Sequence, residues 1–244
     1  MIKGRLYGLG LGPGDPELVT LKALRLMRAA AVVAYPAPDR GDSFSRGIVA
    51  GWLGQGQREI RVRFPMRPGE PPAAIYDSAA QEFAAVLDAG DDIAYLCQGD
   101  PLFYGSFAGI LTRLAARYEV IIVPGVSSLT ACAAAASVPL VQRDQTLSVI
   151  PASLPEDELA RRLRQVDAAA VIKLGRHFPK LRRVLADLGL LDGAIYVERA
   201  SLPNQRVAAL AAIDPASVPY FATVLVGPGG SPIRRPVSHP ENRE

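Results

Sequence analysis

The chain has 244 residues, of which 49% are hydrophobic and 21% charged, and its formal net charge is +3. This balance is typical of a globular protein and excludes a polycation that coats nucleic acid. Two cysteines and two histidines are too few for a disulfide framework or a histidine-based metal cluster, so no metal site is predicted.

The first half of the chain alternates apolar runs typical of buried strands with runs of helical periodicity. Between residues 17 and 30, for example, large apolar residues recur every third position and favour one buried helix face. Such alternation implies a mainly parallel sheet. The predicted strands are 5–11, 31–35, 59–62, 92–97 and 119–123, and the predicted helices are 17–30, 43–53, 73–89 and 105–116.

The pattern changes between residues 139 and 146, where charged residues return before a new strand at Leu147. Ser153 and Glu156 have the spacing of a capping box, which predicts a helix opening there. The last strand candidates follow one another closely, so some of them should be antiparallel. One predicted strand starts at residue 147, and the other predicted strands are 169–174, 194–199, 205–210 and 220–226. The predicted helices are 156–166 and 177–188.

These patterns predict an α/β protein with two α/β domains. The expected divisions are a first domain at 1–123, a linker segment at 124–145, a second domain at 146–234 and a mobile tail at 235–244.

One uncharged stretch, 120–142, is long enough to cross a bilayer, but prolines, a glycine and serines divide it. We therefore expect no membrane helix, and the N-terminus has no apolar signal region. Cys97 and Cys132 lie in apolar surroundings, as small buried residues do in a reducing compartment. The sequence thus predicts a cytoplasmic protein.

The tripeptide Gly99-Asp100-Pro101 stands between the strand that ends at Cys97 and the next predicted helix. Ligands of open α/β sheets bind outside the carboxyl ends of the strands, where a glycine lets the backbone approach them closely. Asp100 could cap the helix or accept a hydrogen bond from a ligand, and the sequence leaves both roles open.

Four glycines alternate at the end of the first strand, at positions 8, 10, 12 and 14. They do not match the dinucleotide-binding G-x-G-x-x-G fingerprint, because Pro13 and Asp15 occupy the positions of its third glycine. A P-loop is excluded as well, since no Gly-Lys-Ser/Thr follows. An NAD-dependent oxidoreductase is therefore not expected, whereas a nucleoside ligand without phosphates is compatible with this loop.

Four motifs, in this order, resemble the signatures of the tetrapyrrole (corrin/porphyrin) methylases. They are YGLGLGPGDPELVTLKA at 7–23, the segment 96–106 with Gly99-Asp100-Pro101, PGVSS at 124–128, and VERAS followed by Gln205-Arg206 at 197–206. The resemblance covers about residues 5–226. Within the family, residues 99–107 are most similar to the precorrin-2 C20-methyltransferases of cobalamin synthesis.

The resemblance implies that S-adenosylmethionine binds in a cleft between the two domains and that the enzyme is a homodimer. Leu174 stands where relatives often have methionine, and Ala200 stands where many have glycine. The cofactor-binding residues carried over by motif are Pro13, Gln98, Gly99, Asp100, Phe103, Ser127, Ser128, Leu174 and Ala200.

The implied reaction is methyl transfer to C20 of precorrin-2, which gives precorrin-3A. A meso carbon of a reduced tetrapyrrole can attack by itself, so the enzyme has chiefly to hold the methyl group in line with it. Asp100, Tyr104 and water are the candidate acceptors of the proton that C20 then loses. Pro36 stands where the uroporphyrinogen III methylases usually carry Asp, which argues against that substrate.

Arginine greatly outnumbers lysine in this chain. Genome base composition is one explanation, and recognition of the substrate carboxylates by guanidinium groups is the other. Arg176 and Arg199 are the first candidates for substrate binding because they flank the C-terminal motifs. The further candidates are Arg40, Arg46, Arg61, Arg63, Arg67 and Arg143.

Several alternatives stay open at this point. The substrate could be cobalt-factor II, another position of the corrin ring could be methylated, or the acceptor could be a protein side chain, as in diphthine synthesis. A noncatalytic tetrapyrrole- or nucleoside-binding protein is an alternative of another class, and turnover of S-adenosylmethionine separates it from the enzymes. Neither nucleic acid nor a membrane is an expected partner.

Overall fold

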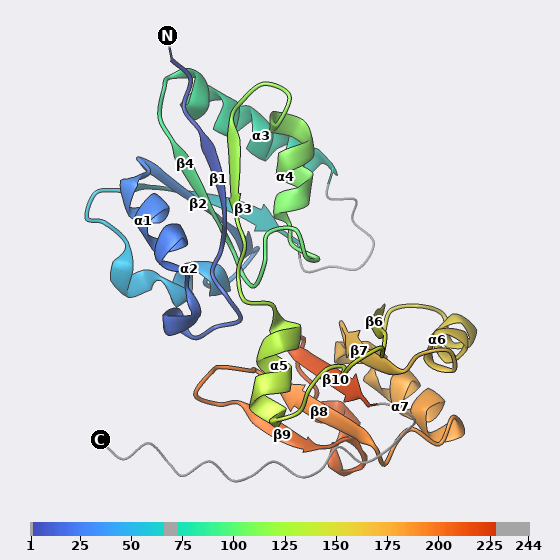
Figure 1. The fold of residues 1–244 in the computed structure, drawn as a ribbon. Coiled ribbons are helices and arrows are strands. Elements are labelled where there is room, and N and C mark those ends of the chain that lie inside the picture. Colours follow the sequence, from blue (N-terminus) through green and yellow to red (C-terminus); the bar gives the residue numbers. More distant parts are fainter. Residues whose placement is uncertain (1, 66–72, 228–244) are drawn as a thin grey trace, which may run out of the picture. The chain divides into compact units, whose positions relative to one another are not determined.

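The structure is a computed structural model that describes residues 2–65 and 73–227 (Figure 1). It divides into two compact units, Met1–Ser127 and Ser128–Glu244. Each unit has a five-stranded sheet with helices, so the predicted α/β class is confirmed. The predicted linker at 124–145 stays a prediction, and the predicted tail at 235–244 lies outside the described residues.

The sheet of the first unit is parallel throughout, as the βα alternation predicts. Its strand order is β3-β2-β4-β1-β5, and every pair of neighbours is parallel. The central strands β1 and β4 are buried along their whole length, so the site-bearing loops that follow them start from the most rigid part of the unit. The strands are β1 (Leu6–Gly10), β2 (Val32–Pro38), β3 (Arg58–Phe64), β4 (Ile93–Cys97) and β5 (Val120–Val123).

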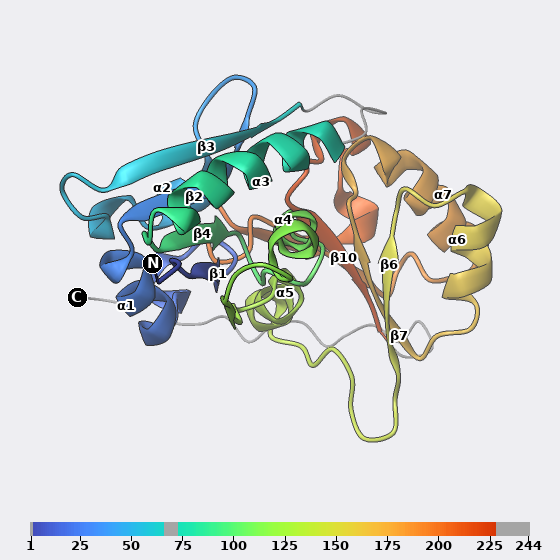
Figure 2. The same ribbon diagram turned by 90° about the horizontal axis from the view of Figure 1, so that it is seen from above.

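Helices cover both faces of this sheet (Figures 1 and 2). Helices α1 (Leu21–Ala29) and α2 (Phe44–Ile48) pack into one apolar cluster, and α3 (Ala73–Asp88) and α4 (Phe107–Leu114) pack into the other. The predicted helix at 43–53 is shorter than expected, because α2 ends at Ile48 and a single 3-10 turn follows it.

Proline is tolerated in β2 because of where the neighbouring strands end. β4 pairs with β2 only along 32–34, whereas β3 continues to pair with it through Pro36 and Pro38. The prolines, which lack an N–H donor, therefore lie where only one side of the strand is paired. The Pro36 carbonyl oxygen accepts a 2.6 Å hydrogen bond from the buried Ser43 hydroxyl.

The sheet of the second unit is mixed, in the order β6-β7-β10-β8-β9. β6 is parallel to β7, β10 is antiparallel to both β7 and β8, and β9 is antiparallel to β8, which confirms the expected antiparallel pairing. β7 and β8 therefore end at the same edge, where β10 begins. The strands are β6 (Leu147–Pro151), β7 (Ala168–Ile172), β8 (Ala194–Glu198), β9 (Arg206–Ala209) and β10 (Ala222–Val226).

Helices α6 (Glu156–Leu163) and α7 (Phe178–Asp187) pack on one face of this sheet, and α5 (Ser128–Ala136) packs on the other. Helix α6 starts where it was expected, but the predicted capping box is wrong. Pro155 occupies the cap position, and no side chain caps the helix. Proline, whose ring fixes φ at −52°, has no side-chain oxygen that could accept an N–H of the first turn.

Candidate functional site

The loops that follow β1 and β4 are hydrogen-bonded to each other. The Leu11 N–H donates to the Cys97 carbonyl oxygen at 2.9 Å, and Gly12 and Gly99 exchange two backbone hydrogen bonds of 3.3 and 2.7 Å. The carboxyl ends of parallel strands lie side by side, which lets their loops pair in this way. The first and second motifs, with Pro13 and Gly99, therefore lie against each other.

The loop after β5 meets these two loops through glycines. A Cβ atom on Gly125 would lie 2.1 Å from the Gly99 carbonyl oxygen, and one on Gly10 would lie 2.4 Å from the Gly125 nitrogen. No Cβ atom fits at such distances, so this approach of three backbones requires glycine. Sequence reasoning did not select Gly10 and Gly125 as site residues. Ser127 ends the first unit just beyond this junction, and Ser128 begins α5.

The Asp100 carboxylate links two of the loops. One of its oxygens accepts the Leu102 N–H at 2.9 Å, and the other accepts the Gly125 N–H at 3.1 Å. Helix α4 begins only at Phe107, so a helix-capping role for Asp100 is wrong. The structure instead makes Asp100 a brace between its own turn and the loop after β5.

Bare backbone and exposed aromatic side chains lie next to each other after β4. Gly99 has a φ of +67°, and a Cβ atom built on it would meet no atom within 4 Å. Gln98 before it is half-buried, whereas Phe103 and Tyr104 are exposed and their rings pack edge to face at 5.1 Å. Backbone groups and apolar rings together suit a ligand that has both polar edges and apolar surface.

In the second unit, the predicted residues gather where β7 and β8 end. The residue after each strand has a positive φ, 59° at Lys173 and 50° at Arg199. Leu174 and Ala200 follow these residues and are buried. Because β7 and β8 end at one edge of the sheet, Leu174 and Ala200 lie along that edge, whereas Ser128, the third predicted cofactor position of this unit, begins α5.

A buried carboxylate holds Arg199 at this edge. Glu198 is only 6% exposed and accepts hydrogen bonds from the Tyr196 hydroxyl and, at 2.8 Å, from Nη1 of Arg199. Burial and the neighbouring Glu198 raise the pKa of the Tyr196 hydroxyl, which therefore remains a donor. Sequence reasoning missed Glu198, although a glutamate that ends an apolar strand and precedes an arginine is a usable signal for such an anchor.

Replacing Glu198 with glutamine should destabilise the protein. The glutamine oxygen can still accept one of the two hydrogen bonds, but the glutamine NH2 group faces the donor of the other, Tyr196 or Arg199. A buried polar group therefore loses its partner, which lowers the free energy of unfolding by about 1–3 kcal/mol. Urea unfolding measures this loss. Glu158→Gln is the matched control, because Glu158 pairs with Arg161 and Arg162 on the surface of α6 and should contribute little. Equal midpoints for both variants would contradict the anchoring role.

The predicted arginines of the first unit belong mainly to a network on β3. Arg46 binds Glu59 through two hydrogen bonds of 2.8 and 2.9 Å, and Glu59 also accepts the Tyr35 hydroxyl at 2.5 Å. Arg61 donates to the Tyr35 oxygen at 3.2 Å, and Arg63 donates to two backbone carbonyls at the end of β2, those of Pro38 and Asp39. Arg40, Arg143 and Arg176 are exposed, and Arg67 lies outside the described residues.

This network predicts a contribution to stability that depends on pH. The hydrogen bonds from Arg46 lower the pKa of Glu59 from 4.5 to about 2, and Tyr35 adds to this shift. The stabilisation is therefore present above pH 4.5 and is lost as the pH falls towards 2. The difference in unfolding free energy between wild type and Glu59→Gln should shrink over this range. Glu82→Gln, which removes an exposed partner of Arg58 at 3.6 Å, should show no such trend.

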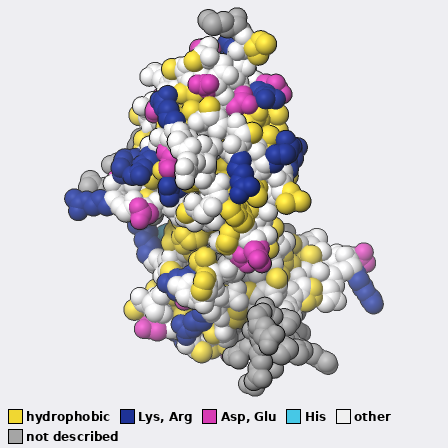
Figure 3. Space-filling view, turned by 90° about the vertical axis from the view of Figure 1, so that its left-hand side faces the viewer, with side chains coloured by type: hydrophobic (Ala, Val, Ile, Leu, Met, Phe, Trp, Pro, Cys, Tyr) yellow, Lys and Arg dark blue, Asp and Glu magenta, His cyan; other side chains and the backbone are white. Residues whose placement is uncertain are grey.

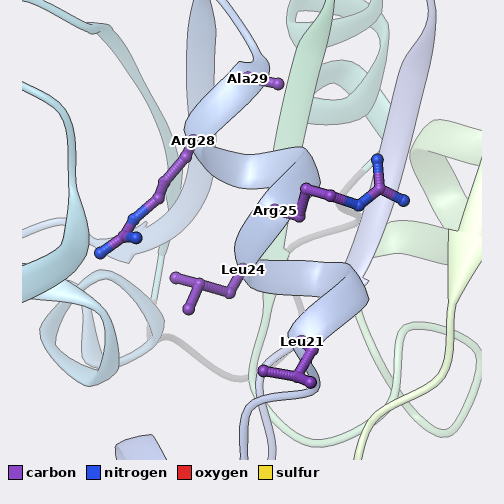
Figure 4. Close-up of a pocket in the computed structure, with 5 residues that line it drawn as sticks. All are labelled: Leu21, Leu24, Arg25, Arg28 and Ala29. Carbon is purple, nitrogen blue, oxygen red and sulfur yellow. The ribbon is translucent and has the colours of Figure 1, made fainter.

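A shallow hollow on the surface of α1 contains none of the predicted site residues (Figure 4). The guanidinium groups of Arg25 and Arg28 point to opposite sides of the helix in Figure 4, so they do not converge on one anion. Arg28 donates to the Trp52 carbonyl oxygen at 3.4 Å. The hollow is lined by Leu21, Leu24, Arg25, Arg28 and Ala29.

Residues 2–65 and 73–227 contain no group of three His, Cys, Asp or Glu residues that could hold a metal ion. No helix among them is long and apolar enough to cross a membrane. On the face shown in Figure 3, basic side chains lie among acidic and apolar ones and form no continuous basic surface.

Comparison with known proteins supports the motif assignment. The family profile described as "Tetrapyrrole (Corrin/Porphyrin) Methylases" matches residues 5–213. The chain belongs to the tetrapyrrole methylase family. This match includes the three loops joined around Gly99 and the edge of the second sheet with Leu174 and Ala200.

Three named relatives are between 34% and 48% identical to this chain over the aligned residues. The chain is 48% identical over 93% of its length to cobalamin biosynthesis protein CobIJ of Mycobacterium tuberculosis, but it spans about half of that protein, 46%. It is 43% identical to the precorrin-2 C(20)-methyltransferase of a Sinorhizobium species, with 91% of this chain and 95% of that protein covered. It is 34% identical to the cobalt-precorrin-2 C(20)-methyltransferase of Salmonella typhimurium, with 92% and 97% covered.

Solved structures of tetrapyrrole methylases share the fold. The uroporphyrin-III C-methyltransferase of Thermus thermophilus, in complex with S-adenosyl homocysteine, matches with a TM-score of 0.69 and 26% identity, covering 92% of this chain and 97% of that one. A cobalt precorrin-4 methyltransferase matches with a TM-score of 0.71 and 24% identity, covering 91% and 94%.

Proposed function

We propose that this protein transfers a methyl group from S-adenosylmethionine to C20 of precorrin-2, giving precorrin-3A in cobalamin biosynthesis. The observation that carries the proposal is the 43% identity to a precorrin-2 C(20)-methyltransferase over nearly the full length of both chains. The proposal also accounts for the departure at Pro36 from the pattern of the uroporphyrinogen III methylases.

S-adenosylmethionine would supply the methyl group as a sulfonium. In the first unit, we assign its binding to Gly99, where open space beside bare backbone fits a closely approaching ligand. The other proposed donor-binding residues of this unit are Pro13, Gln98, Asp100, Phe103 and Ser127. In the second unit they are Ser128, Leu174 and Ala200.

The protein's contribution to the reaction is to hold its two substrates in line and away from water, which can supply roughly 7–11 kcal/mol of the barrier. The side chains proposed to accept the C20 proton are Asp100 and Tyr104, with water as the alternative. Both oxygens of Asp100 already accept backbone N–H groups, so Asp100 acts by positioning the loops. Arg176 and Arg199 would bind substrate carboxylates.

Incubation with methyl-labelled S-adenosylmethionine and each candidate tetrapyrrole tests this function. Mass spectrometry should show one added methyl group, and carbon-13 NMR should assign it to C20. A label at another ring carbon would replace the proposed product. Binding of tetrapyrrole with no formation of S-adenosylhomocysteine would point to a binding protein instead.

A cobalt-containing substrate is the second candidate. It is favoured by the 34% identity to a cobalt-precorrin-2 C(20)-methyltransferase, which again covers almost all of both chains. Competition between precorrin-2 and its cobalt complex in the same assay distinguishes the two, because the natural substrate should have the higher kcat/KM.

We further propose a homodimer that works in the cytoplasm. The two cysteines, Cys97 and Cys132, are free and buried, as expected for a reducing compartment. Light scattering of the purified protein tests the dimer, and a monomer mass at assay concentrations would contradict it.

A further inference from the structure

An exposed aromatic pair stands immediately before β10. The Tyr220 side chain is 60% exposed and that of Phe221 is 39% exposed, and their rings lie 5.3 Å apart at 76° to each other. Large aromatic side chains at the surface are typical of binding sites, because they contribute apolar contact area at little cost in conformational entropy. The motifs that identify the family do not include these two residues.

The strand order brings this pair to the edge of the second sheet that carries Arg199. β10 is antiparallel to β7 and β8, and Ala222, its first residue, pairs with Glu198, the last residue of β8. The Arg199 N–H donates to the Phe221 carbonyl oxygen at 2.9 Å. The aromatic pair is thus fixed by a backbone hydrogen bond to the residue proposed to bind substrate carboxylates.

Two cationic residues flank the pair. Arg199 follows β8 and Lys173 follows β7, and both strands pair with β10. Glu198 holds the Arg199 guanidinium through a 2.8 Å hydrogen bond to Nη1. Apolar rings and two cationic residues at one edge of a sheet complement a ligand that has an apolar ring system and carboxylates at its rim.

We propose that Tyr220 and Phe221 form the surface that receives the tetrapyrrole ring and thereby help to determine substrate specificity. Their rings pack against the apolar macrocycle while Arg199 and Lys173 bind its carboxylates. This inference rests on the proposed function, since it takes a polycarboxylated tetrapyrrole as the ligand. It assigns to the pair no role in binding the methyl donor.

Alanine substitutions at the pair test the inference. Tyr220→Ala and Phe221→Ala should each raise the KM for the tetrapyrrole roughly tenfold, the effect expected of an aromatic residue at the centre of a binding surface. The kcat and the affinity for S-adenosylmethionine, measured by calorimetry, should change little. Tyr220→Phe keeps the ring and should recover most of the affinity. Leu21→Ala is the matched control, because it also removes a large apolar side chain that is exposed, to 86%, and it lies on α1 of the first unit.

Absorbance titration with the tetrapyrrole separates failure of the inference from failure of the proposed function. Wild-type protein that neither binds nor methylates the tetrapyrrole would overturn both. Wild-type protein and alanine variants that bind it equally would overturn the inference alone. An unchanged KM with an altered mass in light scattering would identify the pair as an interface with a second copy of the chain. Equal losses of affinity for the methyl donor and for the tetrapyrrole would overturn the inference and show that the aromatic pair stabilises the fold instead.

Discussion

Replacing Gly125 with alanine should abolish donor binding and lower the stability of the protein. The new Cβ atom would lie 2.1 Å from the Gly99 carbonyl oxygen and 2.8 Å from the Gly10 carbonyl carbon, so the three loops have to separate. Forcing atoms into a packed region costs about 1–3 kcal/mol or more. The displaced backbone includes Gly99, the proposed contact with the donor, so calorimetry should detect no binding of S-adenosylmethionine.

Gly4→Ala is the matched control for this effect. Its Cβ atom would lie 1.9 Å from the Asp91 carbonyl oxygen, near the opposite end of β1 from the glycine junction. This variant should also unfold more easily in urea, but its folded fraction should bind the donor like wild type. Wild-type donor affinity in Gly125→Ala, or an equal loss in both variants, would show that the glycine junction does not form the donor site.

Replacing Asp100 with alanine should likewise abolish binding of S-adenosylmethionine in calorimetry. The substitution removes the acceptor of two backbone N–H groups, those of Leu102 and Gly125, and so disconnects two of the three loops. Asp100→Asn should retain part of the affinity, because its amide oxygen can still accept one of these hydrogen bonds.

The control for Asp100 is Asp214→Ala. Asp214 makes the same kind of local hydrogen bond, accepting the Ala216 N–H at 3.0 Å in the second unit, but it braces no second loop. Its loss should reduce stability by about 1 kcal/mol without a change in donor affinity. Unchanged donor affinity in Asp100→Ala would restrict the Asp100 carboxylate to the local turn.

Periodicity predicted the fold well because each half of the chain buries its elements in a regular way. The central strands β1 and β4 of the first sheet are buried on both faces, so their apolar runs stand out in the sequence. Predictions of how helices begin were wrong at two places. Pro155 takes the position that the capping-box spacing suggested for Ser153, and residues 101–106 form turns before α4 begins.

The site was predictable only as a set of loops at the ends of strands. The order of the motifs along the chain indicates which loops carry function. The separation of Gly99 and Gly125 in the sequence, however, does not predict how close they lie in the folded protein. Glu198 was missed because the pattern of apolar residues in a strand does not reveal which residues a single buried glutamate will bind. Tyr220 was missed for a similar reason, since it was counted simply as the start of a strand.

The junction of Gly10, Gly99 and Gly125 is made by main-chain atoms, and this has an evolutionary consequence. The contacts demand glycine at positions 10 and 125, and the φ of +67° favours glycine at position 99, whereas they set no requirement on exposed side chains nearby. Exposed residues such as Tyr104 can therefore change without moving this junction. Proteins that share this fold carry names that refer to different tetrapyrroles. If the proposed donor site is right, a junction built from backbone would allow the methyl acceptor to differ between relatives while the donor site is kept.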